Sequence, residues 1–416
     1  MWQSLGRNLK GLITAVCLLA FALCAIEIGL RVDRYRSAQN GQPSVATEDL
    51  SIEEQLVAPS LSTWVEMLPG AKTKLRSPDT GDLIPIQTSS FGTRGREPEV
   101  PKPKGLLRVL CLGDETTLAA ELHSEETYPA RLESLLSEQL GANVEVINAG
   151  LPGSCPRVAA LLLRHRLMAL EPDLVVLHFG MSDVAEDAAV RRFVTVSRDG
   201  TPTLAIHPAT KRACQLKQPR LSEEFLIVQQ AERQLARLWD REMPASEESV
   251  TDRRQLYRWT EDNPPELEDE IQSTFAPLAA IRELCQGAGA RLLVSTTPMP
   301  WQVSESASNT REARATFGIP KSACWTSEAP FQRLAAACRE LEIPSVIPLR
   351  QFVNDEAPDE LFLIHSPGLS PAGHQLYAET LAEAILGQGA AQPADAATDT
   401  EIVPSKSETL EFRSTR

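Results

Sequence analysis

The residues best suited to chemistry stand directly after apolar runs of the chain. Gly113-Asp114-Glu115 follows the run Leu106–Leu112, and Gly180-Met181-Ser182-Asp183 ends a run that begins at Asp173. His365 stands shortly before the last amphipathic segment. Carboxylates, hydroxyls and imidazoles are the groups with which proteins attack carbonyl carbons and transfer protons. The sequence therefore offers Glu115 and His365 as candidates for a nucleophile or an acid–base pair.

The elements that must position these residues form a regular alternation. Apolar runs predict strands, and apolar residues at helical spacing predict helices. The alternation favours an α/β fold in three layers, α/β/α, with a central parallel sheet. The expected strands are Leu106–Leu112, Val144–Ile147, Asp173–Gly180, Arg291–Thr296 and Ser345–Leu349, and the expected helices are Thr127–Leu140, Pro156–Leu170, Ile271–Gln286, Phe331–Leu341 and Pro371–Leu386.

Four short blocks, each at a strand-to-helix junction, resemble those of the SGNH (GDSL-like) hydrolases of the membrane-anchored bacterial type. The blocks are Gly113-Asp114, Asn148 to Gly153, Gly180-x-x-Asp183 and Leu369–His374. The resemblance covers roughly residues 105–387, apart from an insertion at about 184–265. Ser89–Gly95 is similar to the stretch that precedes this domain in some members. The resemblance implies a flavodoxin-like sheet and chemistry on ester bonds.

In that family a serine after Gly-Asp attacks the ester carbonyl. Its amide, a glycine amide and an asparagine side chain bind the oxyanion, and a histidine preceded three residues earlier by an aspartate removes the serine proton. Mapped onto this chain, four of these five positions differ. The nucleophile position is Glu115, the glycine donor is Gly153, the asparagine position is Ser182, the aspartate position is His365 and the histidine position is Gly368.

These replacements remove the nucleophile and the base together. Glu115 places a negative charge where the oxyanion would develop. At an effective dielectric constant of about 20, a unit charge about 4 Å away interacts by about 4 kcal/mol. This is comparable to the gain from one oxyanion donor, about 2.7–4 kcal/mol. Gly368 cannot carry a proton. We therefore expect no catalytic residue at the family positions.

Several residues keep a second interpretation. Glu115 is either a new catalytic carboxylate or an anion that binds turn amides or pairs with His365 across the cleft. His365 is either the base of a rebuilt dyad or a surface histidine. A shifted register would make His365 the family histidine and put Phe362 at the aspartate position. Ser154, beside Gly153, is a weaker candidate nucleophile.

The remaining histidines and aromatic residues favour structural roles. His374 belongs to the block that starts the last helix, and His178 lies inside a predicted buried strand. His123, His165 and His207 lack partners at metal-ligand spacing, and no CxxC pair is present, so we expect no metal and no cofactor. The acidic stretch Glu247–Asp269 indicates a solvated insertion. Four aromatic residues either pack in the core or line a carbohydrate groove: Trp239, Tyr257, Trp259 and Trp301.

Composition and the amino terminus define the compartment. The 416 residues carry a net charge of −15, which disfavours a nucleic-acid partner. After a tail at 1–10, residues 11–30 are apolar over a length that spans a bilayer, and an uncleaved anchor is favoured over a cleaved signal peptide. The soluble body is then extracytoplasmic.

Cys324 and Cys338 are either disulfide partners or buried thiols. Residues 31–104 read as a stalk and lead-in, and 388–416 as a disordered tail.

Three functions fit these observations. The first is an inactive relative of the hydrolases that binds an acylated or glycan ligand, or an envelope protein, through the former active-site cleft. The second is an active ester hydrolase or acyltransferase with substitute catalytic residues. The third is an architectural envelope protein.

Overall fold

The computed structural model describes residues 55–198, 200–210, 256–261 and 267–387, together with residues 22, 23, 25–27 and 29. The tail at 1–10, most of the predicted span at 11–30, Trp239 and the segment 388–416 lie outside the described residues, as do 31–54 and most of the stretch Glu247–Asp269. Within the described ranges, no helix has both the length and the apolar character that a membrane crossing requires.

A five-stranded parallel sheet forms the centre of the fold. Its strands lie in the order β11-β10-β7-β5-β6, and every neighbouring pair is parallel. This is the flavodoxin-like order, in which the switch point lies between the first and third strands of the sheet. The strands are β5 (Leu107–Gly113), β6 (Val144–Gly150), β7 (Leu174–Phe179), β10 (Arg291–Thr296) and β11 (Ser345–Val346).

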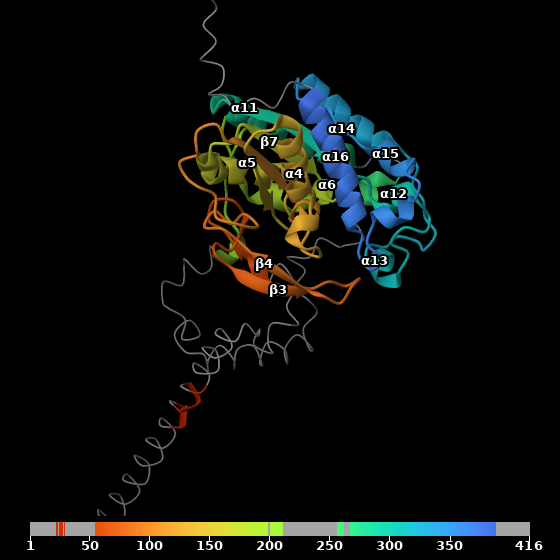
Figure 1. Cartoon of the computed structure of the whole chain (residues 1–416), viewed down its shortest axis with the longest axis horizontal. Coiled ribbons are helices and arrows are strands. Elements are labelled where there is room, and N and C mark those ends of the chain that lie inside the picture. The colour runs from red at the N-terminus through yellow and green to blue at the C-terminus, as the bar shows by residue number, and fades with distance from the viewer. Residues whose placement is uncertain are drawn as a thin grey trace, which may run out of the picture.

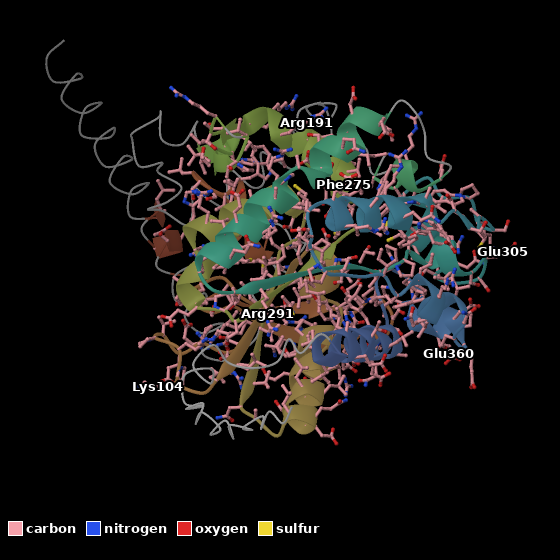
Figure 2. All side chains as sticks on the ribbon, turned by 90° about the horizontal axis from the view of Figure 1, so that it is seen from above. Lys104, Arg191, Phe275, Arg291, Glu305 and Glu360 are labelled. Carbon is pink, nitrogen blue, oxygen red and sulfur yellow. The ribbon has the colours of Figure 1, made fainter. Side chains whose placement is uncertain are left out.

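Helices cover both faces of the sheet, as the alternation predicts. On one face, α4 (Tyr128–Leu140) and α16 (Pro371–Gly387) pack against Val109, Cys111 and Val176. On the other face, α5 (Pro156–His165), α10 (Glu268–Phe275), α11 (Pro277–Gly287) and α14 (Ala329–Glu340) pack against Leu110, Leu112 and Leu177. In Figure 2, Lys104 and Arg291 mark the amino end of the sheet, and Glu305 and Glu360 lie at the opposite end.

Regular structure begins earlier than the sequence predicts. Residues 55–87 form two hairpins, of β1 (Val57–Pro59) with β2 (Val65–Met67) and of β3 (Lys72–Arg76) with β4 (Leu83–Gln87). Alternation places Leu75, Ile84 and Ile86 in the core while the lysines of β3 face outward. This part of the lead-in is therefore attached to the body of the protein, at whose lower edge it lies in Figure 1.

The described part of the insertion also packs on the lead-in. It begins with α6 (Asp183–Val190) and the hairpin of β8 (Val194–Val196) and β9 (Pro202–Ala205). The ring of Trp64 stacks on Phe193 at 4.9 Å and contacts His207 at 4.4 Å. The two added segments therefore stabilise each other.

The remaining differences from the predicted elements have local causes. Pro277 divides the helix expected over 271–286 into α10 and α11, because proline cannot donate the backbone hydrogen bond that a continuous helix needs. The last strand ends at Val346, and Leu349 instead begins α15 (Leu349–Val353). A 3-10 turn, Leu167–Leu170, follows α5.

Candidate functional site

The loops after β5 and β6 bring Glu115 and Gly153 together. Glu115 is the first residue of the short helix α3 (Glu115–Leu118), and Asp114 caps this helix by accepting from the Thr116 amide at 2.9 Å. The Gly153 amide donates to Glu115 Oε1 at 3.1 Å. Gly153 has a positive φ of 67°, which is favourable for glycine. The oxyanion donor that the resemblance assigns to Gly153 is therefore occupied by a carboxylate of the chain itself.

The side chain at the asparagine position is also bound to a carboxylate. Ser182 is the N-cap residue of α6, and it lies one turn before Glu186, whose pKa the Ser182 hydroxyl acts to lower. Ser182 is buried. A carboxylate therefore accepts from the predicted donor after β6, and a second carboxylate lies close to the predicted donor after β7.

Four acidic residues gather at these strand ends: Asp114, Glu115, Asp183 and Glu186, here called the strand-end carboxylates. Burial first, then the charges of Asp114 and Glu186, raise the pKa of Asp183 well above its usual range. Burial, then the charges of Glu115 and Asp114, raise the pKa of Glu186 in the same way. The site thus disfavours further negative charge, the opposite of what an oxyanion needs.

Gly180 permits the approach of two of these carboxylates. A Cβ at this position would collide with Asp114 Oδ2 and lie 3.0 Å from Asp183 Oδ1.

Asp114 differs from the other strand-end carboxylates because a histidine, His178, lies beside it. Burial acts to raise its pKa, but His178 and the Thr116 amide outweigh burial and lower it.

The loop before α16 does not bring His365 to Glu115. His365 Nδ1 lies 3.1 Å from Asp79 Oδ1, and the amides of Ile364 and His365 donate to the same carboxylate at 2.5 and 2.8 Å. Asp79 comes from the turn between β3 and β4. The predicted pairing of His365 with Glu115 is therefore replaced by a pairing with the lead-in hairpin.

Gly368, at the histidine position, lies beside a different acid. A Cβ on Gly368 would lie 3.1 Å from Glu121 Oε2, which accepts from the Ser366 hydroxyl at 2.7 Å. Burial is the main cause of a raised pKa at Glu121. Phe362 stands at the aspartate position in the shifted register. It packs in the core against Phe352 and has no carboxylate. In neither register does this loop supply an acid–histidine pair.

A hydroxyl, an imidazole and a carboxylate do form a chain beneath the strand-end site. Thr297, directly after β10, places Oγ1 3.1 Å from His178 Nε2, and His178 Nδ1 lies 3.2 Å from Asp114 Oδ1. The order of groups is that of a hydrolytic triad. However, the three residues are only 5 %, 2 % and 6 % exposed, and Nδ1 is not aligned for a hydrogen bond. The contacts with Thr297 and Asp114 therefore make His178 a core histidine with a polar neighbour on each side of its ring.

The other predicted residues have structural surroundings. His374 is buried and accepts from the Tyr128 amide at 3.1 Å, and burial lowers its pKa to about 3. Ser154 is buried. Tyr257, Trp259 and Trp301 are core residues, so they do not line a carbohydrate groove. Cys324 and Cys338 are free thiols. In the described part of the chain, no three acidic, histidine or cysteine residues are arranged to hold a metal ion.

Sequence reasoning missed four residues of this region: Asp79, Glu121, Glu186 and Thr297. Glu186 had a detectable signal, because it follows Ser182 by four residues and would lie one turn away if a helix began there. Asp79 had none, since it lies 286 residues from the loop that it binds.

Comparisons with known proteins give one family match and several similar solved structures. A profile of the GDSL-like lipase/acylhydrolase family matches residues 111–376. No curated protein matches the chain. Similar solved structures include a GDSL-like lipase from Bacteroides thetaiotaomicron, with 14 % identity over 68 % of this chain and 88 % of that one and a TM-score of 0.34. An acetyl xylan esterase, AlAXEase, shares 14 % over 67 % and 100 %, with a TM-score of 0.36. A lipase/acylhydrolase from Enterococcus faecalis shares 14 % over 68 % and 96 %, with a TM-score of 0.35.

Proposed function

Since the chain belongs to the GDSL-like lipase/acylhydrolase family, we propose that it is an inactive member of that family, which acts by binding. The former active-site region serves as the binding surface. Its ligand is an acylated glycan or an envelope protein partner. This proposal separates the fold, which the chain keeps, from ester hydrolysis, which it has lost.

One observation carries the proposal: the Gly153 amide donates to Glu115 at 3.1 Å. An oxyanion hole works because its donors are directed at the place where negative charge develops. Here that donor already binds a negatively charged side chain, and Ser182 lies close to a second acid, Glu186. A substrate oxygen would have to displace one carboxylate and lie close to the other.

The base is missing independently of the oxyanion donors. Gly368 has no side chain, and His365 is held by Asp79 on the lead-in. Neither predicted base position would therefore supply a proton acceptor to a hydroxyl introduced at position 115. The loss of both functions supports a binding role.

We also propose a location. The apolar residues 11–30 act as an uncleaved anchor, and the α/β domain lies outside the cytoplasm, where acylated glycans and envelope proteins are found. Carbonate-resistant membrane association of the full-length protein, with protease access to the domain from outside, is the expected result. Release of the domain by carbonate, or protection from external protease, would contradict this location.

The proposed loss of activity is tested by turnover. Full-length protein in detergent is assayed on a panel of short and long acyl esters and on acetylated oligosaccharides, beside a Glu115→Ala variant. We expect equal background rates for both proteins, together with saturable binding of one acylated glycan or envelope protein. Turnover that the Glu115→Ala substitution abolishes would overturn the proposal.

A second candidate, an active hydrolase or acyltransferase, is favoured by the contact of Thr297 with His178. In this reading Thr297 is the nucleophile, His178 the base and Asp114 the orienting acid. Burial of Thr297 opposes it, because an ester carbonyl must reach the hydroxyl. A Thr297→Val variant keeps the size of the side chain and removes the hydroxyl, so loss of turnover in this variant alone would favour the second candidate.

A further inference from the structure

The strand-end carboxylates contain hydrogen-bond acceptors without partners. Asp183 is 2 % exposed, and its Oδ1 atom accepts no hydrogen bond among the described residues. The same holds for Oε2 of Glu186. Buried polar atoms are almost always paired, so two unpaired carboxylate oxygens in one cluster call for an explanation.

The two acids are brought to the site by the same helix. Asp183 begins α6, and Glu186 follows three residues later, so both lie on one side of the helix. Asp183 Oδ1 faces Asp114 across Gly180. Glu115 is exposed at the outer edge of the cluster and holds the Gly153 amide. The cluster therefore extends from the protein surface to a buried end.

Charge within this cluster is poorly balanced. The neighbouring acids act on Asp183 and Glu186 in the direction that favours their protonated forms. His178, which lies on β7, contacts Asp114 rather than the two acids of α6. A ligand that brings a positive charge and N–H donors would satisfy both needs of the cluster at once.

We propose that Asp183 and Glu186, with Glu115 at the exposed edge, bind an organic cation that carries N–H donors, namely a primary ammonium or a guanidinium group. The proposal rests on the proposed function, since it names the ligand chemistry of the same region. The unpaired oxygens need donors, which a quaternary ammonium lacks. A metal ion is disfavoured because the described residues include no suitable ligand group.

Protons compete with such a ligand for the same oxygens. The titratable groups that face one another are Asp114 and Glu115 at the start of α3, Cys155 before α5, Asp183, Glu186 and Asp187 on α6, and His178 on β7. Because the bound cation favours ionised carboxylates, its affinity rises as the pH rises from 5.5 to 7.5.

The test is a titration of full-length protein with n-butylammonium and with n-butylguanidinium at pH 5.5 and at pH 7.5, in which ligand-observed NMR measures binding. Tetramethylammonium and Mg²⁺ at equal ionic strength serve as comparison cations. The peptide N-acetyl-Gly-Arg-Gly, which has no free amine, tests whether an arginine side chain can be the source of the cation. We expect saturable binding of one or both N–H cations at pH 7.5. The affinity for tetramethylammonium should be at least tenfold lower, and the affinity for the N–H cations should be at least tenfold lower at pH 5.5.

Two variants locate the site. Asp183→Asn and Glu186→Gln should each weaken binding at least tenfold, whereas Glu138→Gln, an exposed residue of α4, should not change it. Absence of saturable binding, unchanged affinity in both site variants, or equal affinity for tetramethylammonium or Mg²⁺ would overturn the inference. Ester turnover is measured on the same samples. Cation binding together with turnover would contradict only the proposed inactivity, and absence of both binding and turnover would contradict only the cation site.

Discussion

At the scale of single residues, function depends on where a charge is placed. Glu115 accepts from the Gly153 amide, the predicted oxyanion donor, and Gly368, the residue at the predicted base position, has no side chain. The sequence predicts that Glu115, Ser182 and Gly368 are replacements at family positions. The partner of Ser182 required the structure, because Glu186 belongs to no motif of the family.

Restoring the nucleophile alone should not restore chemistry. In a Glu115→Ser variant the Gly153 donor becomes available, but Gly368 has no side chain and His365 is bound to Asp79. Asp183 and Glu186 still oppose negative charge. We expect its hydrolysis of p-nitrophenyl acetate to equal that of Glu115→Ala. A rate more than tenfold above this control would show that a base is present.

Asp183 should also make stability depend on pH. Its folded pKa is raised above the unfolded value, so above about pH 4 the folded state binds more protons than the unfolded state. The free energy of unfolding therefore decreases as the pH rises through this range. Asp183→Asn, which resembles the protonated acid, should reduce the decrease, as measured by urea unfolding between pH 4 and 8. The exposed Asp82→Asn variant is the control, and an identical pH dependence in all three proteins would contradict the assignment.

At the scale of elements, long apolar patterns were predictable and short ones were not. The strand expected at Arg291–Thr296 has those bounds, and each end of β5 and β7 lies within one residue of the predicted end. The hairpins before residue 88 were missed because three- to five-residue strands with lysines on one face give little signal. Their alternation over Lys72–Arg76 and Leu83–Gln87 was the available sign.

The hairpin of β3 and β4 should determine the order of the loop before α16. Asp79 accepts from the amides of Ile364 and His365 and contacts the His365 ring. Asp79→Ala removes all three contacts. We expect faster amide hydrogen exchange at Ile364 and His365, with no change for Asp82→Ala in the same turn. Unchanged exchange in Asp79→Ala would mean that the loop is held by its other contacts.

At the scale of the whole molecule, residues 55–104 of the lead-in and the hydrolase-like domain form one structure. Arg94 joins them: its amide donates to the Asn148 carbonyl at 2.8 Å, and its guanidinium donates to the carbonyls of Leu118, Ala119 and Leu122. Burial lowers the pKa of Arg94 to about 10, which leaves it charged at neutral pH. Arg94 thus connects the segment Ser89–Gly95 to the end of α3, the helix that begins with Glu115. The resemblance drew attention to this segment, but its contact was visible only in the fold.

Replacing Arg94 should destabilise the whole domain. Arg94→Met leaves buried carbonyls without donors, each costing about 1–3 kcal/mol. Arg94→Lys keeps the charge but cannot reproduce a fork to three acceptors, so it should recover only part of the loss. Urea unfolding of both variants measures the effect. Full stability of Arg94→Met would show that the lead-in is not needed for the fold.

The central claim, that this fold contains no activated nucleophile, is tested most directly by a fluorophosphonate, which reacts covalently with activated hydroxyl groups. Full-length protein is incubated with the reagent, and its intact mass is compared with that of an active esterase treated in parallel. The account predicts an unchanged mass for this protein and a single adduct on the esterase. An adduct that maps to Thr297, Ser154 or Ser182 would contradict it.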